Sequence, residues 1–221
     1  MEEHPKPDVS VDVVPLTIHD GRLKVLLADR AHEPFKGRMA LIGGFIHVQE
    51  DATAGDAARR VLRDKAHITQ LYVEQLSTFS GAARDPRGWS LSIAYFSLFP
   101  YERIEGALGQ PHLRLVDVDD AHGLPFDHDA IVAAAVSRVR GKGAYSDLTA
   151  RLLHPEFTLP ELHAAYQIAI GEPINIDAFR RRTLERGFLE ATGGSRRAEG
   201  STKQAALYRL KPGNAVFDRR L

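Results

Sequence analysis

The chain has 221 residues, a hydrophobic content of 43% and no cysteine, and its 29 basic residues balance its 29 acidic ones. Without cysteine there is no disulfide framework and no thiolate site, which excludes zinc fingers and thiol nucleophiles. There is no apolar run of about 18 residues, and the opening "MEEHPKPDVS" lacks the features of a signal peptide. We therefore expect a cytoplasmic protein with no membrane partner.

The zero net charge hides a difference between the two ends. Residues 151–221 hold 12 Lys and Arg against 8 Asp and Glu, a net charge of +4, which leaves a net charge of −4 for residues 1–150. A basic C-terminal portion on an acidic body indicates that one end meets a polyanion. Chance clustering on a solvated surface explains the charge alone equally well.

The N-terminal part predicts alternating strands and helices. Apolar runs at 9–18 and 23–30, separated by the turn signal "HDG", predict a β-hairpin. A helix is predicted over 51–65, where small and apolar residues share one stripe, and a second helix is predicted over 126–142. Further strands are predicted at 71–80, 89–100 and 112–120. This order predicts a mixed α/β layer.

The composition becomes helical and basic after a break at 141–157. Thr158 and Glu161 form a capping box that starts a helix ending at Gly171. A second helix is predicted over 176–186, with Asn175 as N-cap, and it is followed by a strand, a glycine-rich basic turn and another strand. Helix, turn, helix and β-ribbon is the order of a winged helix-turn-helix. We therefore predict two domains, 1–150 and 151–221.

The segment "GGFIHVQEDATAGDAARRVLRDKAHI", residues 43–68, resembles the Nudix box, G-x5-E-x7-R-E-U-x-E-E-x-G-U, whose glutamates bind the Mg²⁺ of a nucleoside diphosphate linkage. Gly44 and Glu50 keep the first spacing. If Arg60 takes the arginine position, the four residues Val61, Asp64, Lys65 and His67 stand where the box has Glu, Glu, Glu and Gly. Mg²⁺ needs oxygen ligands, so we predict no catalytic residues and no metal site, apart from weak Mg²⁺ binding at Glu50 and Asp64.

Read together, the degenerate box, "ARDPRGWSLSIAYFSL", "LPFDHDAIVAAAVSRVRGK" and "LLHPEFTLPELHAAYQIAIGEPINIDAFRRRTLERGFLEATG" resemble the Nudix-related transcriptional regulators of NAD metabolism, the NrtR family. The resemblance covers about residues 9 to 210. It implies an α/β (α+β) Nudix fold, a mixed sheet sandwiched by helices, followed by a winged helix. It also implies ADP-ribose or a related nucleotide as effector with no required cofactor, double-stranded operator DNA as partner, and a homodimer.

The nucleotide site is predicted at the glycine loop and at the loop "RDPRG". Arginines suit diphosphates through bidentate hydrogen bonds, although the same loop could be a solvated turn. Phe45 is either a core residue or a ring that stacks on adenine. The predicted effector-binding residues are Gly43, Gly44, Phe45, Glu50, Arg59, Asp64, Arg84, Asp85 and Arg87.

The second C-terminal helix carries three consecutive arginines in "AFRRRTLERG". Its pattern places Phe179 and Leu184 toward a core, so at least two of the arginines must be exposed. Exposed arginines are often only solvated, but a recognition helix followed by a basic wing favours DNA binding. The predicted DNA-binding residues are Arg180, Arg181, Arg182, Thr183, Arg196, Arg197 and Lys203.

Three functions remain open from the sequence. The chain is a ligand-responsive DNA-binding repressor, a Nudix pyrophosphatase of the ADP-ribose type with an accessory helical domain, or a scaffold that binds no nucleotide. The basic helix and wing favour the first over the second, and so do the missing glutamates.

Overall fold

The structure is a computed structural model that describes residues 6–69, 72–197, 203–218 and 220–221. The chain separates into two compact units. The first comprises Lys24–Leu98 and Arg103–Ala135 together with the segment that ends at Leu16, and the second comprises Val136–Leu221 with Thr17–Leu23 and Phe99–Glu102.

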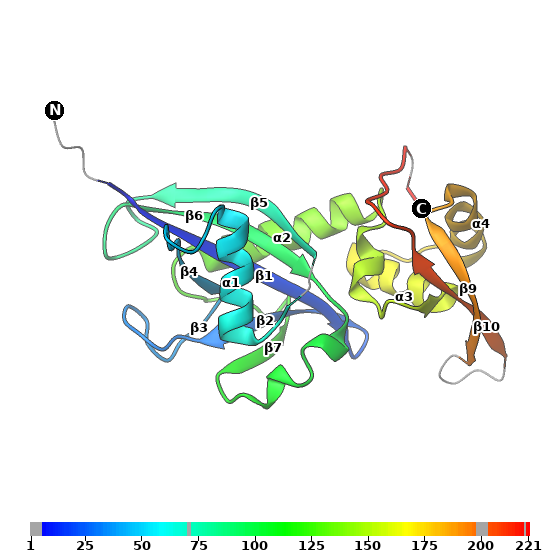
Figure 1. The fold of residues 1–221 in the computed structure, drawn as a ribbon, viewed down its shortest axis with the longest axis horizontal. Helices are drawn as coiled ribbons and strands as arrows, with labels where there is room; N and C mark the ends of the chain where they lie inside the picture. Colours follow the sequence, from blue (N-terminus) through cyan, green and yellow to red (C-terminus); the bar gives the residue numbers. More distant parts are fainter. Residues whose placement is uncertain (1–5, 70–71, 198–202, 219) are drawn as a thin grey trace. The chain divides into compact units, whose positions relative to one another are not determined.

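Within the described residues, seven strands form a mixed sheet whose main path runs β3-β2-β1-β6-β5 (Figure 1). Strand β1 lies parallel to β6 and antiparallel to β4, while β7 pairs with β2. The predicted hairpin is present as β1 and β2. The bounds are β1 (Asp8–His19), β2 (Arg22–Asp29), β3 (Met39–Ala40), β4 (Ile42–Phe45), β5 (Tyr72–Gly81), β6 (Ser90–Leu98) and β7 (Leu113–Asp117).

Two helices accompany this sheet. In Figure 1, α1 (Ala54–Ala66) crosses in front of the strands and α2 (His128–Gly143) passes behind them. Consecutive residues of β1 from Val11 to Thr17 are all buried, which requires cover on both faces of the strand. Two short 3₁₀ helices, Tyr101–Arg103 and Ala107–Gly109, lie between β6 and β7.

Helix α1 begins later than its apolar pattern predicted. Thr53 is the N-cap, and its side chain accepts a hydrogen bond from the Asp56 amide while Asp56 bonds back to the Thr53 amide. This capping box fixes the first turn, so Asp51 lies outside the helix. At the other end His67 adopts a left-handed conformation (φ 55°), and its amide bonds to carbonyls of the last turn.

The second unit is built from α3 (Leu159–Ile170), α4 (Ile176–Arg186) and a three-stranded sheet in the order β8-β10-β9. The predicted caps are confirmed: Thr158 and Glu161 form the capping box of α3, Asn175 caps α4, and Gly171 and Gly187 are left-handed at the two C-termini. The remaining bounds are η3 (Leu148–Leu152), β8 (Phe157–Thr158), β9 (Leu189–Arg197) and β10 (Gln204–Leu210).

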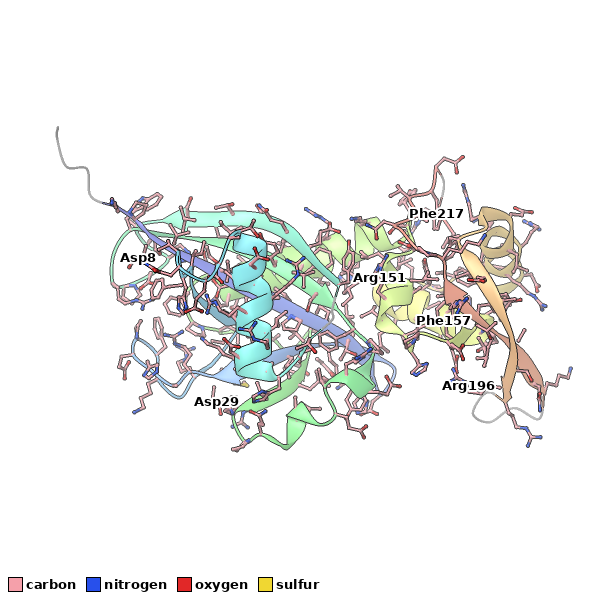
Figure 2. All side chains as sticks on the ribbon, in the orientation of Figure 1. Asp8, Asp29, Arg151, Phe157, Arg196 and Phe217 are labelled. Atoms are coloured by element: carbon pink, nitrogen blue, oxygen red, sulfur yellow. The ribbon has the colours of Figure 1, made fainter. Side chains whose placement is uncertain are left out.

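A separate hydrophobic core holds the second unit together. Tyr166 is fully buried at its centre and donates a hydrogen bond to the Ser146 carbonyl at 2.6 Å. Figure 2 labels two further members, Phe157 and Phe217, which come from β8 and from the C-terminal segment. Since the core draws on residues from Ala144 to Leu221, the C-terminal segment is part of this unit.

Candidate functional site

The first unit contains a cavity of about 670 Å³ at the glycine loop. Its walls come from β1, β4, α1, the segments that follow β2 and β5, and the segment that leads into α2. Two of the nine residues predicted to hold an effector, Glu50 and Arg59, do not line it. The seven that do are Gly43, Gly44, Phe45, Asp64, Arg84, Asp85 and Arg87.

Asp12 forms the charged floor of this cavity and is only 7% exposed. It accepts a hydrogen bond from Ser92 Oγ at 2.6 Å, and His128 Nε2 and Arg84 Nη2 each lie 3.6 Å from its oxygens. Burial by itself would raise the pKa of Asp12, but His128, Ser92 and Arg84 together lower it to about 2. The floor is therefore an ionised carboxylate within a fixed network.

At Gly43 and Gly44 the backbone lies so close to neighbouring atoms that a Cβ has too little room. A Cβ on Gly43 would lie 2.0 Å from Asp12 Oδ1 and 2.6 Å from the Val11 carbonyl, and one on Gly44 would lie 3.1 Å from Val61 Cγ1. Any side chain at the first position would displace the backbone of β4 from β1. The glycine loop therefore brings bare backbone into the cavity wall.

Arg60, not Arg59, carries the arginine function of the motif. Its Nε and Nη2 bind the two oxygens of Asp51 at 2.8 Å, and Nη2 also donates to the Phe45 carbonyl at 2.9 Å. These bonds lower the pKa of Asp51 to about 2. Arg59 is 61% exposed and faces solvent, and Glu50 is 4.0 Å from Arg60. Asp51, which lies just before the helix, is therefore the carboxylate that holds Arg60.

The two arginines of the "RDPRG" loop are both bound to carboxylates. Arg84 is buried and forms two bonds of 2.9 Å with Asp127 and one of 3.1 Å with Ser90. Arg87 is clamped by Asp85, with its shortest bond at 2.7 Å. The predicted role of Arg84 as a phosphate ligand is not supported, because its donors hold the loop to the start of α2. Arg87 keeps one face of its guanidinium toward the cavity.

Planar groups gather at one end of the cavity. Phe45 is 42% exposed, which excludes a core role, and the Arg87 guanidinium lies 5.2 Å from its ring and 6.0 Å from the ring of Phe126. Arg30 lies over Phe126 at 4.7 Å. Such alternating rings and guanidiniums stack well on an aromatic base.

The carboxylates expected of a metal site are not assembled. Among the described residues, no group of three or more His, Cys, Asp or Glu side chains lies close enough to hold a metal ion. Asp64 lines the cavity and is bound by Arg63 at 2.7 Å, and Glu50 pairs at 3.5 Å with His47, which also lines the cavity. Both carboxylates considered for weak Mg²⁺ binding therefore already pair with a basic side chain.

Two substitutions in the motif argue further against a resident divalent metal. Val61 supplies no ligand, and the Lys65 ammonium donates a hydrogen bond to the Gly43 carbonyl at the cavity wall. Partial burial and the nearby Arg30 lower the pKa of Lys65 from its ordinary value. Two unit charges about 4 Å apart near a protein surface interact by about 4 kcal/mol, and a divalent ion doubles that repulsion. The residues present do not fit Mg²⁺.

In the second unit, the face assignment of α4 needs correction. Phe179 and Thr183, four residues apart, are the buried pair, whereas Leu184 is 46% exposed. Thr183 has no exposed surface, so it cannot contact DNA in this fold. The three arginines 180–182 are all exposed, as expected. Helix α4 contains few apolar residues. The apolar pattern therefore placed its buried face at residue 184, one residue after the buried Thr183.

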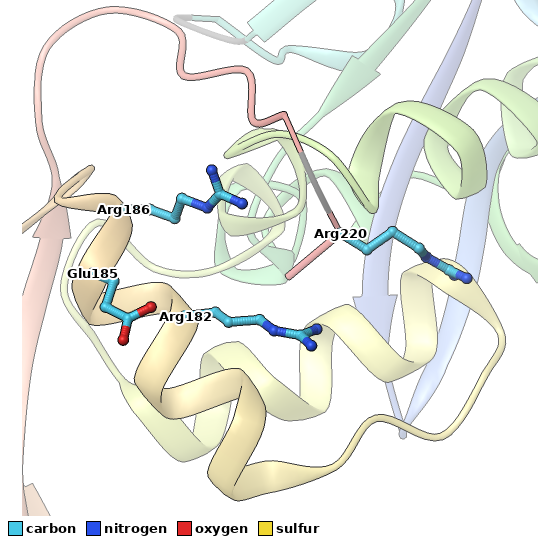
Figure 3. Close-up of a pocket in the computed structure, with 4 residues that line it drawn as sticks. All are labelled: Arg182, Glu185, Arg186 and Arg220. Atoms are coloured by element: carbon cyan, nitrogen blue, oxygen red, sulfur yellow. The ribbon is translucent and has the colours of Figure 1, made fainter.

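The three arginines of α4 point to different places. Arg182 shares a hollow of about 520 Å³ with Glu185 and Arg186 of the same helix and with Arg220 from the C-terminal segment (Figure 3). Arg180 instead lines a groove between the starts of α3 and α4 and strand β10. The arginines therefore do not form a single reading edge.

The wing residues are also not equivalent. Arg196 is tied to Glu161 by a salt bridge of 2.7 Å, and the same carboxylate caps α3. Arg197 and Lys203 are exposed near the end of the ribbon. The turn itself, residues 198–202, lies outside the described residues. Of the predicted wing cations, Arg196 has a structural role that the sequence did not reveal.

Comparison with known proteins identifies both parts of the chain. A family model described as "NrtR DNA-binding winged helix domain" matches residues 149–210. The chain is 35% identical, over 94% of its length and 84% of the relative, to the "ADPR responsive transcriptional repressor NtrR" of Acinetobacter baylyi. The chain belongs to the NrtR family.

Solved structures of the family from Shewanella oneidensis agree with this fold. One, NrtR complexed with a 27mer DNA, has a TM-score of 0.90 at 34% identity and covers 96% of this chain and 99% of that chain. Another, the NUDIX domain of NrtR complexed with ADP ribose, has a TM-score of 0.55 at 33% identity over 61% of this chain and 90% of that chain. The predicted fold class and family are confirmed. Within its described residues, the chain has no helix long and apolar enough to cross a membrane.

Several residues of this NrtR pocket were missed by the sequence. The sequence did contain a signal for one of them. Asp12 lies among the valines of β1, and an aspartate in an apolar strand needs hydrogen-bond or charged partners. The other missed pocket residues lie in loops or on helix faces, and the residues that they contact are distant along the chain. The missed lining residues discussed above are Asp12, Arg30, Arg60, Lys65, Phe126 and His128.

Proposed function

We propose that this NrtR-family chain is a DNA-binding transcriptional repressor whose first unit senses ADP-ribose or a closely related nucleotide, and that it regulates NAD metabolism. The observation that carries the proposal is the 35% identity to an ADP-ribose-responsive repressor across both units. The charged cavity supports the sensing role, because it offers a glycine loop and cations to a nucleotide while Val61 and Lys65 stand at two carboxylate positions of the motif.

The nucleotide is held by the glycine loop, Phe45 and Arg87 of the predicted set, together with Arg30 and Phe126. The rings and guanidiniums accept the base, and the bare backbone at the two glycines lets the diphosphate approach closely. Asp85 acts indirectly by clamping Arg87. Of the remaining predicted residues, Arg84 holds the pocket together, while Glu50 and Arg59 lie outside its lining.

DNA is bound by the winged-helix domain, which we place at 151–221 within the larger second unit. The family match to 149–210 supports that boundary. Arg180 and Arg181 on α4, with Arg197 and Lys203 on the wing, are the proposed contacts, because all four are exposed and none of them lines the hollow that Arg182 shares with Arg186 and Arg220. A winged helix of this size reads few base pairs, so a homodimer with two half-sites about one helical turn, ~34 Å, or a multiple of that apart supplies the specificity.

The decisive experiment couples the two units. Duplexes selected from a random pool by the full-length chain are titrated in gel shifts with and without ADP-ribose. We expect a near-palindromic site and a change of at least fivefold in its affinity when ADP-ribose is present, about 1 kcal/mol of coupling. A chain that selects no sequence, or whose DNA affinity is the same at saturating ADP-ribose, contradicts the proposal.

The alternative of a Nudix hydrolase is tested separately. With Mg²⁺ present, the chain is expected to convert ADP-ribose to AMP and ribose 5-phosphate at a negligible rate, because two carboxylate positions are occupied by Val61 and Lys65. Turnover in the usual enzyme range, about 1 to 10³ s⁻¹, would establish the hydrolase instead.

A further inference from the structure

Lys65 lines the cavity beside the glycine loop. It stands at a carboxylate position of the motif, and its Nζ donates to the Gly43 carbonyl oxygen. A Cβ built on Gly44 would come within 3.8 Å of the same nitrogen. The ammonium therefore sits against the glycine loop, with both glycines beside it.

The charges around Lys65 favour an anion. Arg30 and Arg60 act on it as positive neighbours, and the carboxylate that acts on it most strongly is Asp12. Asp12 is already engaged by Ser92, by the Arg84 guanidinium and by the His128 ring at the cavity floor. The other acidic side chain beside Lys65 on α1 is Asp64, which binds Arg63. Arg60 is already paired with Asp51, so Arg30 and Lys65 are the two cavity-lining cations whose charge a diphosphate would balance.

We propose that the Lys65 ammonium replaces the divalent metal and donates hydrogen bonds to the diphosphate, so that this pocket selects a nucleoside diphosphate free of metal. The inference rests on the proposed binding of nucleotide by the first unit. A lysine ammonium is a compact point charge with three donors. One of them already holds the Gly43 carbonyl, and because Lys65 lines the cavity the other two are left for a ligand there.

The arrangement also separates binding from hydrolysis. A divalent ion both binds phosphate oxygens and stabilises the charge that develops when the linkage is cleaved. An ammonium fixed by a backbone carbonyl provides the first effect with a single charge and generates no metal-bound hydroxide. A nucleotide held in this way is retained intact, which suits a sensor.

The test is calorimetric titration of ADP-ribose into the full-length chain, once with EDTA and once with excess Mg²⁺. The wild type is expected to bind equally well in both buffers, within about twofold. Lys65→Met keeps the length of the side chain and should lower affinity about 10- to 100-fold in both, the range for losing a charged hydrogen bond. Lys65→Arg should retain most of the affinity.

Two further variants keep the result interpretable. Lys36→Met removes the same charge from an exposed position of the same unit that does not line the cavity, and should bind as the wild type does. Lys65→Glu restores the carboxylate of the motif, so binding should fall in EDTA and recover with Mg²⁺. Thermal melting of each variant checks that the fold is intact.

The outcomes separate the two proposals. A wild type that needs Mg²⁺, or a folded Lys65→Met variant with wild-type affinity, overturns the inference about Lys65 and leaves the proposed function standing. A wild type that binds no ADP-ribose in either buffer overturns the proposed function itself and the inference with it.

Discussion

Three arginines of the nucleotide pocket each bind a carboxylate of the same chain through two nitrogen atoms, whereas the three consecutive arginines of α4 make no hydrogen bond or ion pair with any described residue. The pocket arginines are Arg60, Arg84 and Arg87. Those of α4, residues 180–182, are exposed and point to different places around the helix. The same residue type therefore serves as internal scaffold in one unit and as an unbalanced charged surface in the other.

The difference follows from the partner each unit is proposed to meet. A small nucleotide needs its contacts fixed in advance, since each ordered side chain that is already in place reduces the cost of binding. DNA carries a continuous line of negatively charged phosphates. A protein surface whose positive charge is not balanced within the protein therefore attracts DNA whatever its sequence. Breaking the pocket network should therefore affect stability, and removing α4 arginines should affect DNA affinity alone.

The largest effect is expected when the pocket floor is removed. Asp12→Ala leaves His128 and Arg84 without their shared buried carboxylate, and removing one member of a buried charged network costs about 3 kcal/mol or more. Urea denaturation should show that decrease in the free energy of unfolding. Glu105→Ala, at an exposed position of the same unit, should change it by less than about 0.5 kcal/mol. Equal effects of the two variants would refute the network as a source of stability.

The same carboxylate predicts a pH dependence. The folded-state pKa of Asp12, about 2, lies below its ordinary value of 3.8, so ionised Asp12 stabilises the fold above about pH 4. That stabilisation is lost as the pH falls from about 4 to about 2, and it amounts to about 2 kcal/mol. The difference in unfolding free energy between wild type and Asp12→Ala should therefore shrink across this window. A difference that stays constant would contradict the lowered pKa.

The two units also differ in how far their sequence predicts them. The ends of α3 and α4 are set by signals within four residues of the ends: Thr158 with Glu161, Asn175, Gly171 and Gly187 all act as predicted. Such caps use contacts along the chain, so a single sequence contains the information.

The pocket depends on pairs that are distant along the chain. Asp12 meets Ser92 across the parallel pairing of β1 with β6, and Arg84 meets Asp127 at the start of α2. No periodicity shows these pairings, which is why Arg84 was predicted as a phosphate ligand. Arg59 and Arg60 are neighbours on α1, and the tertiary bond of Arg60 to Asp51 shows which of the two lines the cavity.

On α4, Arg181 should matter more for DNA than Arg182. Arg181 is exposed and lines neither of the two hollows beside α4, whereas Arg182 shares a hollow with Arg186 and Arg220. Losing a base contact costs about 1 to 3 kcal/mol, so Arg181→Ala should weaken the selected duplex about tenfold and a scrambled duplex much less. Gel-shift titrations on both duplexes measure this. If Arg182→Ala has the larger effect on discrimination, the assignment of the reading face is wrong.

The wing offers a comparison between neighbouring arginines. Arg197→Ala should weaken specific and random DNA alike, and should flatten the dependence of log affinity on log salt by about one unit. Arg196→Ala should leave that slope unchanged but lower the melting temperature, because Arg196 binds the carboxylate that caps α3. Identical salt slopes for the two variants would remove the distinction between them.

The smallest effect on DNA is expected at Thr183, although it lies directly after the three arginines. Its hydroxyl is buried with no hydrogen-bond partner among the described residues, and it packs on the same side of α4 as Phe179. A buried hydroxyl without a partner is unfavourable, so Thr183→Val should raise the free energy of unfolding by about 1 kcal/mol. DNA affinity should stay within about twofold of the wild type, since no atom of residue 183 reaches the surface. A stable Thr183→Val variant that loses DNA binding would show that α4 turns a different face to DNA, and would restore this threonine to the set of contacts.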